Sequence, residues 1–161
     1  MTRGIVPRER TARPPSLEAR VGAAILAGRS SGGPSRMATK SIGVDAVEVA
    51  RIRALLAERG SAFKKKVFTR GELGLFEGAP DAHIHIAGRF AAKEAVLKVL
   101  GTGWGAGIHW RDVEVLADGE GTPVVHLHGK AEDRAKALGI ERILLSITHT
   151  HDLAMATALG E

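Results

Sequence analysis

Two acidic residues, Asp45 and Glu94, are the candidates for metal chemistry in this sequence. Asp45 lies in the apolar run 42–47, where a carboxylate is costly unless it is paired or binds a metal. Glu94 lies in a separate, helical stretch, so the two could form the oxygen-only, water-rich site that Mg²⁺ prefers and that substrate phosphates complete. The alternative is that Asp45 caps a helix beginning near Glu48.

Basic side chains cluster in the same helical stretch as Glu94. Arg89 and Lys93 are four residues apart and share a helix face, where like charges repel unless an anion lies between them. Glu94 and Lys98 have the same spacing in the favourable order, which predicts a plain solvated ion pair. Arg89, Lys93 and Lys98 could together hold a phosphate, but from spacing alone a solvated basic face is the simpler interpretation.

The seven histidines include three His-x-His pairs. Residues two apart on a helix point in nearly opposite directions, so a helical pair cannot chelate a metal. A pair on one strand face could bind a transition metal, yet no third ligand is indicated nearby. His83 and His85 are the helical pair, and His126 and His128 are the pair on one strand face. The third pair is His149 and His151.

Two further motifs are weak. Ser146, His149 and Asp152 have the residue types of a hydrolase triad, but a spacing of three along a strand alternates faces and no nucleophile elbow is present. The glycine-rich stretch 101–107 follows a helix instead of joining a strand to a helix, so it matches neither the dinucleotide fingerprint nor the P-loop. We interpret it as a flexible turn.

The elements expected to position these residues are helices and strands in mixed order, which predicts an α+β fold with an antiparallel-rich sheet. The first strand should place Asp45 on the face opposite Ile42 and Val44. Thr69 and Glu72 have the spacing of a capping box. The expected strands are 41–47, 110–117, 124–128, 143–148 and 153–159, with a turn at 118–121, and the expected helices are 49–60, 70–76, 84–100 and 130–138.

The composition fits a single domain of 161 residues without cysteine. Without sulfur from cysteine, a disulfide scaffold, a thiol nucleophile and a Cys-ligated metal site are excluded, and a reducing, cytoplasmic compartment is the default expectation. The longest aliphatic stretch near the start, 21–27, is far shorter than the roughly 20 residues of a membrane-spanning helix. We therefore expect no membrane association.

The net charge of +5 comes from the first 36 residues. Seven of the 23 basic and two of the 18 acidic residues lie there, which leaves 16 of each sign in residues 37–161. Segment 1–36 also has four prolines and no aromatic residue, and we interpret it as a disordered extension, with an upstream start or a targeting peptide as alternatives. The positive charge is therefore weak support for nucleic-acid binding, which we do not expect.

Five blocks resemble, in order, the signature sequences of holo-[acyl-carrier-protein] synthase, the small bacterial class of 4′-phosphopantetheinyl transferases. The resemblance spans about residues 40–160, and the third block beside a Gly-Val-Asp strand is its most specific part. The blocks are SIGVD at 41–45, FTRGEL at 68–73, AGRFAAKEA at 87–95, GTG at 101–103 and SITHT at 146–150.

The resemblance implies transfer of the 4′-phosphopantetheine arm of coenzyme A to a serine of apo acyl-carrier protein in fatty acid biosynthesis. It assigns Asp45 and Glu94 as the Mg²⁺ carboxylates and Lys98 as the cation that neutralises the attacked phosphate. Arg89, Lys93 and His149 become candidate phosphate contacts. The base that accepts the serine proton cannot be read from the sequence, and our hypothesis is a water held by the metal or by a carboxylate near Glu94.

The resemblance also implies an α+β homotrimer with coenzyme A bound between protomers. Arg51, together with Arg53, would face the acidic carrier protein, although an exposed helix cation without a partner explains Arg51 nearly as well. The alternative functions are a non-catalytic coenzyme A or nucleotide-binding module of the same fold and, third, a nucleic-acid-binding protein.

Overall fold

The computed structural model describes residues 38–79, 81–103 and 107–161. Their pairings are all antiparallel, in a three-stranded sheet of order β1-β5-β4 and a separate β2-β3 hairpin, which confirms the α+β class. The elements are β1 (Ser41–Glu48), α2 (Val49–Val67), α3 (Arg70–Gly74), α4 (Ala82–Val99), the 3₁₀ turn η1 (Trp110–Asp112), β2 (Val113–Ala117), β3 (Pro123–Leu127), α5 (Gly129–Ala137), β4 (Ile143–His149) and β5 (Leu153–Gly160).

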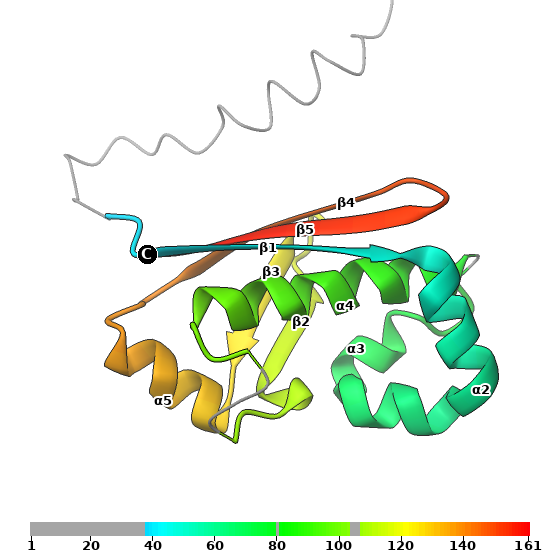
Figure 1. Cartoon of the computed structure of the whole chain (residues 1–161), viewed down its shortest axis with the longest axis horizontal. Coiled ribbons are helices and arrows are strands. Elements are labelled where there is room, and N and C mark those ends of the chain that lie inside the picture. The colour runs from blue at the N-terminus through cyan, green and yellow to red at the C-terminus, as the bar shows by residue number, and fades with distance from the viewer. Residues whose placement is uncertain (1–37, 80, 104–106) are drawn as a thin grey trace, which may run out of the picture. The chain divides into compact units, whose positions relative to one another are not determined.

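Helix α4 lies along one face of the three-stranded sheet, beneath β1 and β5 in Figure 1. The alternation predicted for β1 is confirmed, since Gly43, Asp45 and Val47 are buried or half-buried while Ile42 and Val44 are exposed. Gly43 makes the closest approach, because a Cβ there would lie 2.1 Å from the carbonyl oxygen of Ala95. Strand β1 therefore rests directly on the backbone of α4.

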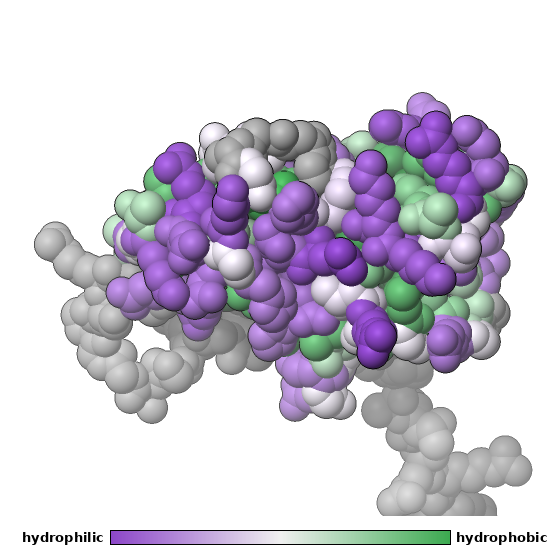
Figure 2. Space-filling view, turned by 90° about the horizontal axis from the view of Figure 1, so that it is seen from below, coloured by the Kyte–Doolittle hydropathy of each residue, from purple (hydrophilic) through white to green (hydrophobic). Residues whose placement is uncertain are grey.

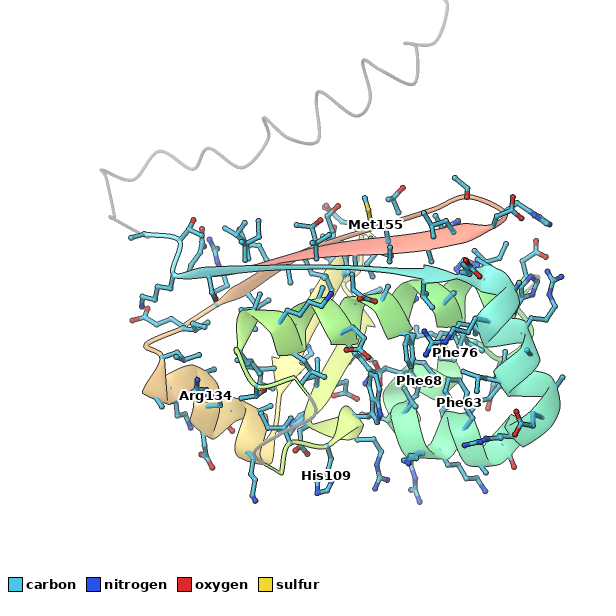
Figure 3. The ribbon with its side chains drawn as sticks, in the orientation of Figure 1. Phe63, Phe68, Phe76, His109, Arg134 and Met155 are labelled. Atoms are coloured by element: carbon cyan, nitrogen blue, oxygen red, sulfur yellow. The ribbon has the colours of Figure 1, made fainter. Side chains whose placement is uncertain are left out.

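The opposite face of this sheet is apolar and open. Register places Ile42, Leu159 and Leu144 in one row across the three strands. Figure 3 shows Met155 pointing away from α4 on this outer face. No described element covers it, whereas the underside of the molecule in Figure 2 is mostly hydrophilic. The large apolar residues exposed on the face are Ile42 at 65%, Val44 at 52%, Leu144 and Leu153 at 42% and Met155 at 39%.

An aromatic cluster joins α2, α3 and α4. Phe68 lies edge-on to Phe63 and Phe76, with centroids 6.3 and 5.2 Å away, and Phe90 lies 4.8 Å from Trp110. Phe63 also lies 6.1 Å from Phe90 on α4. The three phenylalanines labelled in Figure 3 meet beneath the N-terminal half of α4. These contacts fix the α2–α3 segment against the helix.

Two predicted boundaries are wrong for local reasons. Gly60 leaves helical geometry (φ 42°, ψ −117°), as a stop signal should, but it only kinks α2, and the helix continues to Val67 and brings Phe63 to the aromatic cluster. Residues 110–112 form η1 instead of the start of a strand. There the His109 N–H donates to Asp112 Oδ2 at 2.9 Å and closes a turn.

The other predicted elements are confirmed within a few residues, including the capping box of α3, the turn at 118–121 and the antiparallel pair β4–β5. None of the helices in the described ranges combines the length and apolar character that crossing a bilayer requires. Segment 1–36 lies outside the described residues, so its expected disorder stays a prediction.

Candidate active site

Asp45 and Lys98 meet where β1 crosses α4. The Lys98 ammonium lies 3.0 Å from Asp45 Oδ1 and donates to the Val44 carbonyl at 2.6 Å. Half of the Lys98 side chain and a fifth of the Asp45 side chain are exposed, so both groups remain accessible. Glu48, not Asp45, occupies the N-cap position of α2 and makes no side-chain cap, which excludes the capping role for Asp45.

Glu94 lies one helical turn before Lys98 on α4 and is half-buried. The described residues contain no group of three or more His, Asp or Glu side chains that could hold a metal. At most, Asp45 and Glu94 could contribute two carboxylates to a metal site. This donor set fits Mg²⁺, which typically takes one or two carboxylates and fills its remaining positions with water and substrate phosphates.

Lys93 is fully buried and pairs with Glu72. Its Nζ lies 2.8 Å from Glu72 Oε2 and also donates to the carbonyls of Trp110, at 3.0 Å, and Val113. These three partners use all three ammonium hydrogens, and both side chains are 0% exposed. We therefore assign Lys93 a structural role in place of the expected phosphate contact.

Glu72 is the anion that the like-charged Arg89/Lys93 spacing required. Its carboxylate accepts hydrogen bonds from the Thr69 N–H at 2.8 Å and the Val115 N–H at 3.0 Å, besides pairing with Lys93. Burial lowers the pKa of Lys93, and the Glu72 charge opposes that effect. The sequence indicated Glu72 only as a capping residue, so its second role was missed.

Arg89 is half-buried between β2 and Phe76, which follows α3. Its Nε donates to the Val115 carbonyl at 3.4 Å, and its guanidinium lies 5.6 Å from the Phe76 ring centroid. Burial lowers the pKa of Arg89, whereas the nearby Glu72 charge raises it. The side chains of Arg89, Glu72 and Lys93 thus hydrogen-bond to the edge of β2 that does not face β3. Their partners are backbone groups of Val113 and Val115. Arg89 remains a candidate phosphate contact through its other guanidinium N–H groups.

His149 ends β4 and is exposed. Its ring lies 5.9 Å from that of His85 at the start of α4. In the strand register, His149 of β4 pairs with Ala154 of β5, and Ala154 pairs with Val47 of β1. Since β5 lies between β4 and β1, about 9.5 Å separates the His149 backbone from β1. Within one chain, His149 and the Asp45–Lys98 pair therefore lie at opposite edges of the sheet.

The two candidate carrier contacts lie on α2, and both are exposed. Arg53 Nη2 is 2.8 Å from His83 Nε2 on α4. Arg51 is two residues earlier on the same helix. Both guanidinium groups can reach a partner at the surface.

A second polar cluster, centred on Glu114, was not predicted. Thr69 Oγ1 donates to Glu114 Oε1 at 2.5 Å, and His128 Nε2 lies 3.1 Å from Oε2. The Thr69 hydrogen bond, followed by the hydrogen bond and charge of His128, lowers the pKa of Glu114. His126 lies opposite Glu114 in the β2–β3 register. The histidine pair considered for a transition metal thus lies around a carboxylate.

A groove of about 970 Å³ lies between β3, α5 and β4. His126 and His128 line it, but none of the residues that the resemblance assigns to the site does. The candidate catalytic groups instead lie on the surface, where α4 meets the edges of the sheet. Within the described residues, the Asp45 and Lys98 side chains are not enclosed.

Residues 41–158 match the model of the 4′-phosphopantetheinyl transferase superfamily. The chain therefore belongs to the 4′-phosphopantetheinyl transferase superfamily, which confirms the resemblance.

The individual matches narrow the class. A holo-[acyl-carrier-protein] synthase of Solibacter usitatus is 44% identical over 119 residues, which cover 74% of this chain and 95% of that protein. The crystal structure of holo-[acyl-carrier-protein] synthase from Neisseria meningitidis superposes with a TM-score of 0.70 at 33% identity, covering 77% of this chain and 99% of that one. The synthase of Bacillus anthracis, solved in complex with coenzyme A (3′,5′-ADP), superposes with a TM-score of 0.63 at 30% identity. The match covers 76% of this chain and 96% of that one. Within the superfamily, the chain groups with the holo-[acyl-carrier-protein] synthases.

Proposed function

We propose that this protein transfers the 4′-phosphopantetheine group of coenzyme A to a serine of apo acyl-carrier protein, in support of fatty acid biosynthesis. The observation that carries the proposal is the Asp45–Lys98 pair beside Glu94, in a chain that covers 95% of the Solibacter usitatus synthase. The second product is adenosine 3′,5′-bisphosphate.

The reaction needs a nucleophile, a positioned phosphate and neutralised charge. The serine oxygen attacks the phosphorus that bears the pantetheine arm, and the bond from that phosphorus to the oxygen of the adenosine bisphosphate breaks. Lys98 is half exposed and on a rigid helix, so its ammonium can move from Asp45 to the phosphate and stabilise the developing charge. The serine proton passes to a water held near Glu94, which is our hypothesis for the base.

Asp45 and Glu94 are the proposed ligands of Mg²⁺. Bound there, the ion would neutralise and orient the pyrophosphate of coenzyme A. The support is chemical, because Asp45 pairs with Lys98, and Glu94 lies one helical turn before that lysine on α4. Arg89 and His149 are the remaining proposed phosphate contacts.

A homotrimer with coenzyme A between protomers is part of the proposal. The open apolar face with Ile42, Val44 and Met155 is an expected site of self-association, because soluble monomers rarely expose such contiguous patches. The separation of His149 from the Asp45–Lys98 pair in one chain also favours a site completed by a neighbour.

The carrier protein would dock on α2 through Arg51 and Arg53, whose positive charge complements an acidic partner and speeds encounter. The cytoplasmic location expected from the sequence stays a prediction.

The direct test is incubation of the protein with coenzyme A, Mg²⁺ and several apo carrier proteins, followed by intact-mass measurement. The proposal predicts addition of one phosphopantetheine arm to a carrier. Binding of coenzyme A without transfer would instead support the non-catalytic module.

A further inference from the structure

The His149 imidazole, a proposed phosphate contact, packs against a second histidine. The ring of His85, in the first turn of α4, lies with its centroid 5.9 Å from that of His149 and its plane at 84°. Ring pairs favour this edge-to-face geometry. Both side chains are exposed, so the pair is accessible to a ligand.

The helix and the strand beneath the pair are closely packed. Gly88 follows His85 by three residues and shares its helix face, and Ile147 precedes His149 by two and shares its strand face. A Cβ at Gly88 would lie 3.0 Å from Ile147 Cγ2, so α4 and β4 are already in close contact there. The packing of a helix on a strand therefore sets the two rings edge to face.

The neighbouring histidine does not take part in this contact. His83, on the same turn of α4, bonds instead to Arg53 at 2.8 Å. The next imidazole along the chain, His151, has its Nδ1 2.8 Å from Asp152 Oδ1. Among the described aromatic rings, His85 is the one that packs against His149.

We propose that His85 is a positioning residue that holds the His149 imidazole in the orientation needed to meet a phosphate of coenzyme A. The inference rests on the proposed function. His149 ends a strand next to a turn, where a free side chain would lose rotamer freedom on binding. Contact with His85 restricts the ring in advance, which reduces that cost.

The test uses full-length protein and the variants His85→Ala, His85→Phe and His149→Ala. We measure kcat, the KM for coenzyme A and the KM for the carrier, and the Kd for coenzyme A by calorimetry. His85→Ala should raise the KM and Kd for coenzyme A about tenfold and leave the KM for the carrier unchanged. His85→Phe keeps an aromatic ring and should stay within about twofold of the wild type.

A double-mutant cycle separates positioning from a general structural effect. In the His149→Ala background, His85→Ala should cause no further loss of coenzyme A affinity. His151→Ala, which removes an exposed imidazole two residues away, is the matched control and should change none of these constants.

Additive losses in the cycle, equal damage by His85→Phe and His85→Ala, or an unchanged coenzyme A affinity in His85→Ala would each overturn the inference. Failure of the wild type to transfer the arm would overturn the proposed function instead. In that case the calorimetric Kd still tests His85, and absence of coenzyme A binding by the wild type would overturn both.

Discussion

Lys98 of α4 and Asp45 of β1 form an ion pair across the layer where the helix packs on the sheet, with Nζ 3.0 Å from Oδ1. The pair depends on the absence of a side chain at Gly43, two residues before Asp45, where β1 touches the backbone of α4. The proposed catalytic groups are thus positioned by one helix–strand contact and not by a loop.

Asp45→Asn and Glu94→Gln should each lower kcat/KM for Mg²⁺-dependent transfer at least 100-fold, because loss of one stabilising group at a phosphoryl centre has effects of that order. The measurement is steady-state transfer over a range of Mg²⁺ concentrations. Glu120→Gln, in the exposed turn between β2 and β3, is the control. A wild-type rate in either site variant would contradict the metal assignment.

Gly43→Ala should destabilise the fold by about 1–3 kcal/mol or more, because its Cβ would lie 2.1 Å from the Ala95 carbonyl oxygen and the backbone must shift. Transfer activity should fall with it, since Lys98 lies at the same contact. Gly119→Ala is the matched control, with no atom within 4 Å of its added Cβ. Urea unfolding of both variants decides the matter, and equal stability would refute the close-contact argument.

Lys93→Met should destabilise the protein by about 3–5 kcal/mol, because it leaves the Glu72 carboxylate buried without its partner. The double variant Glu72→Leu/Lys93→Met should recover part of this loss. Lys136→Met, which breaks the exposed pair with Glu132, should leave urea unfolding unchanged. If Lys93→Met changed the free energy of unfolding by less than about 1 kcal/mol, the buried pair would not have the role assigned here.

The Glu114 cluster predicts a dependence of stability on pH. Hydrogen bonds lower the pKa of Glu114 in the folded state. The ionised Glu114 therefore stabilises the fold at pH values above its unfolded-state pKa. This stabilisation is lost as the pH falls through the folded-state pKa. The stability advantage of the wild type over Glu114→Gln should therefore shrink below about pH 4.3. Unfolding free energies measured from pH 7 to pH 3 test this, and an advantage that grows on acidification would contradict it.

The open sheet face predicts self-association. The wild type should have the mass of a trimer by light scattering, and Val44→Lys should shift it towards monomer and reduce transfer, because it places a charge in the apolar patch. Glu120→Lys places a lysine in the exposed β2–β3 turn, outside the patch, and should remain trimeric. A monomeric wild type with full activity would refute the proposed assembly.

Local patterns in the sequence predicted most of the elements. The capping box at Thr69 and Glu72, the alternation in β1 and the β4–β5 pair depend on residues close in sequence, and all three are found. Gly60 shows the limit of local prediction, since its φ of 42° fits either a helix end or a kink. The packing of Phe63 on Phe90 favours the kink, because it requires the helix to continue past Gly60.

Part of the site could not be predicted, because it depends on contacts between distant segments. Glu72 and Lys93 are 21 positions apart and meet through the packing of α3, α4 and β2. The unfavourable Arg89/Lys93 spacing did indicate a missing anion, but nothing in the sequence located it in Glu72. Nothing in the sequence indicated that His85 would contact His149. From its position in a helix, His85 could be assessed only as a metal ligand together with His83.

The central claim is transfer of the phosphopantetheine arm by the Asp45–Glu94–Lys98 site, and the intact mass of an apo carrier protein tests it most directly. After incubation with wild-type protein, coenzyme A and Mg²⁺, the carrier should gain the mass of one arm, and adenosine 3′,5′-bisphosphate should appear in equal amount. With Asp45→Asn, the carrier should stay at its apo mass over the same time. An unchanged carrier mass with the wild type across several carriers would contradict the account.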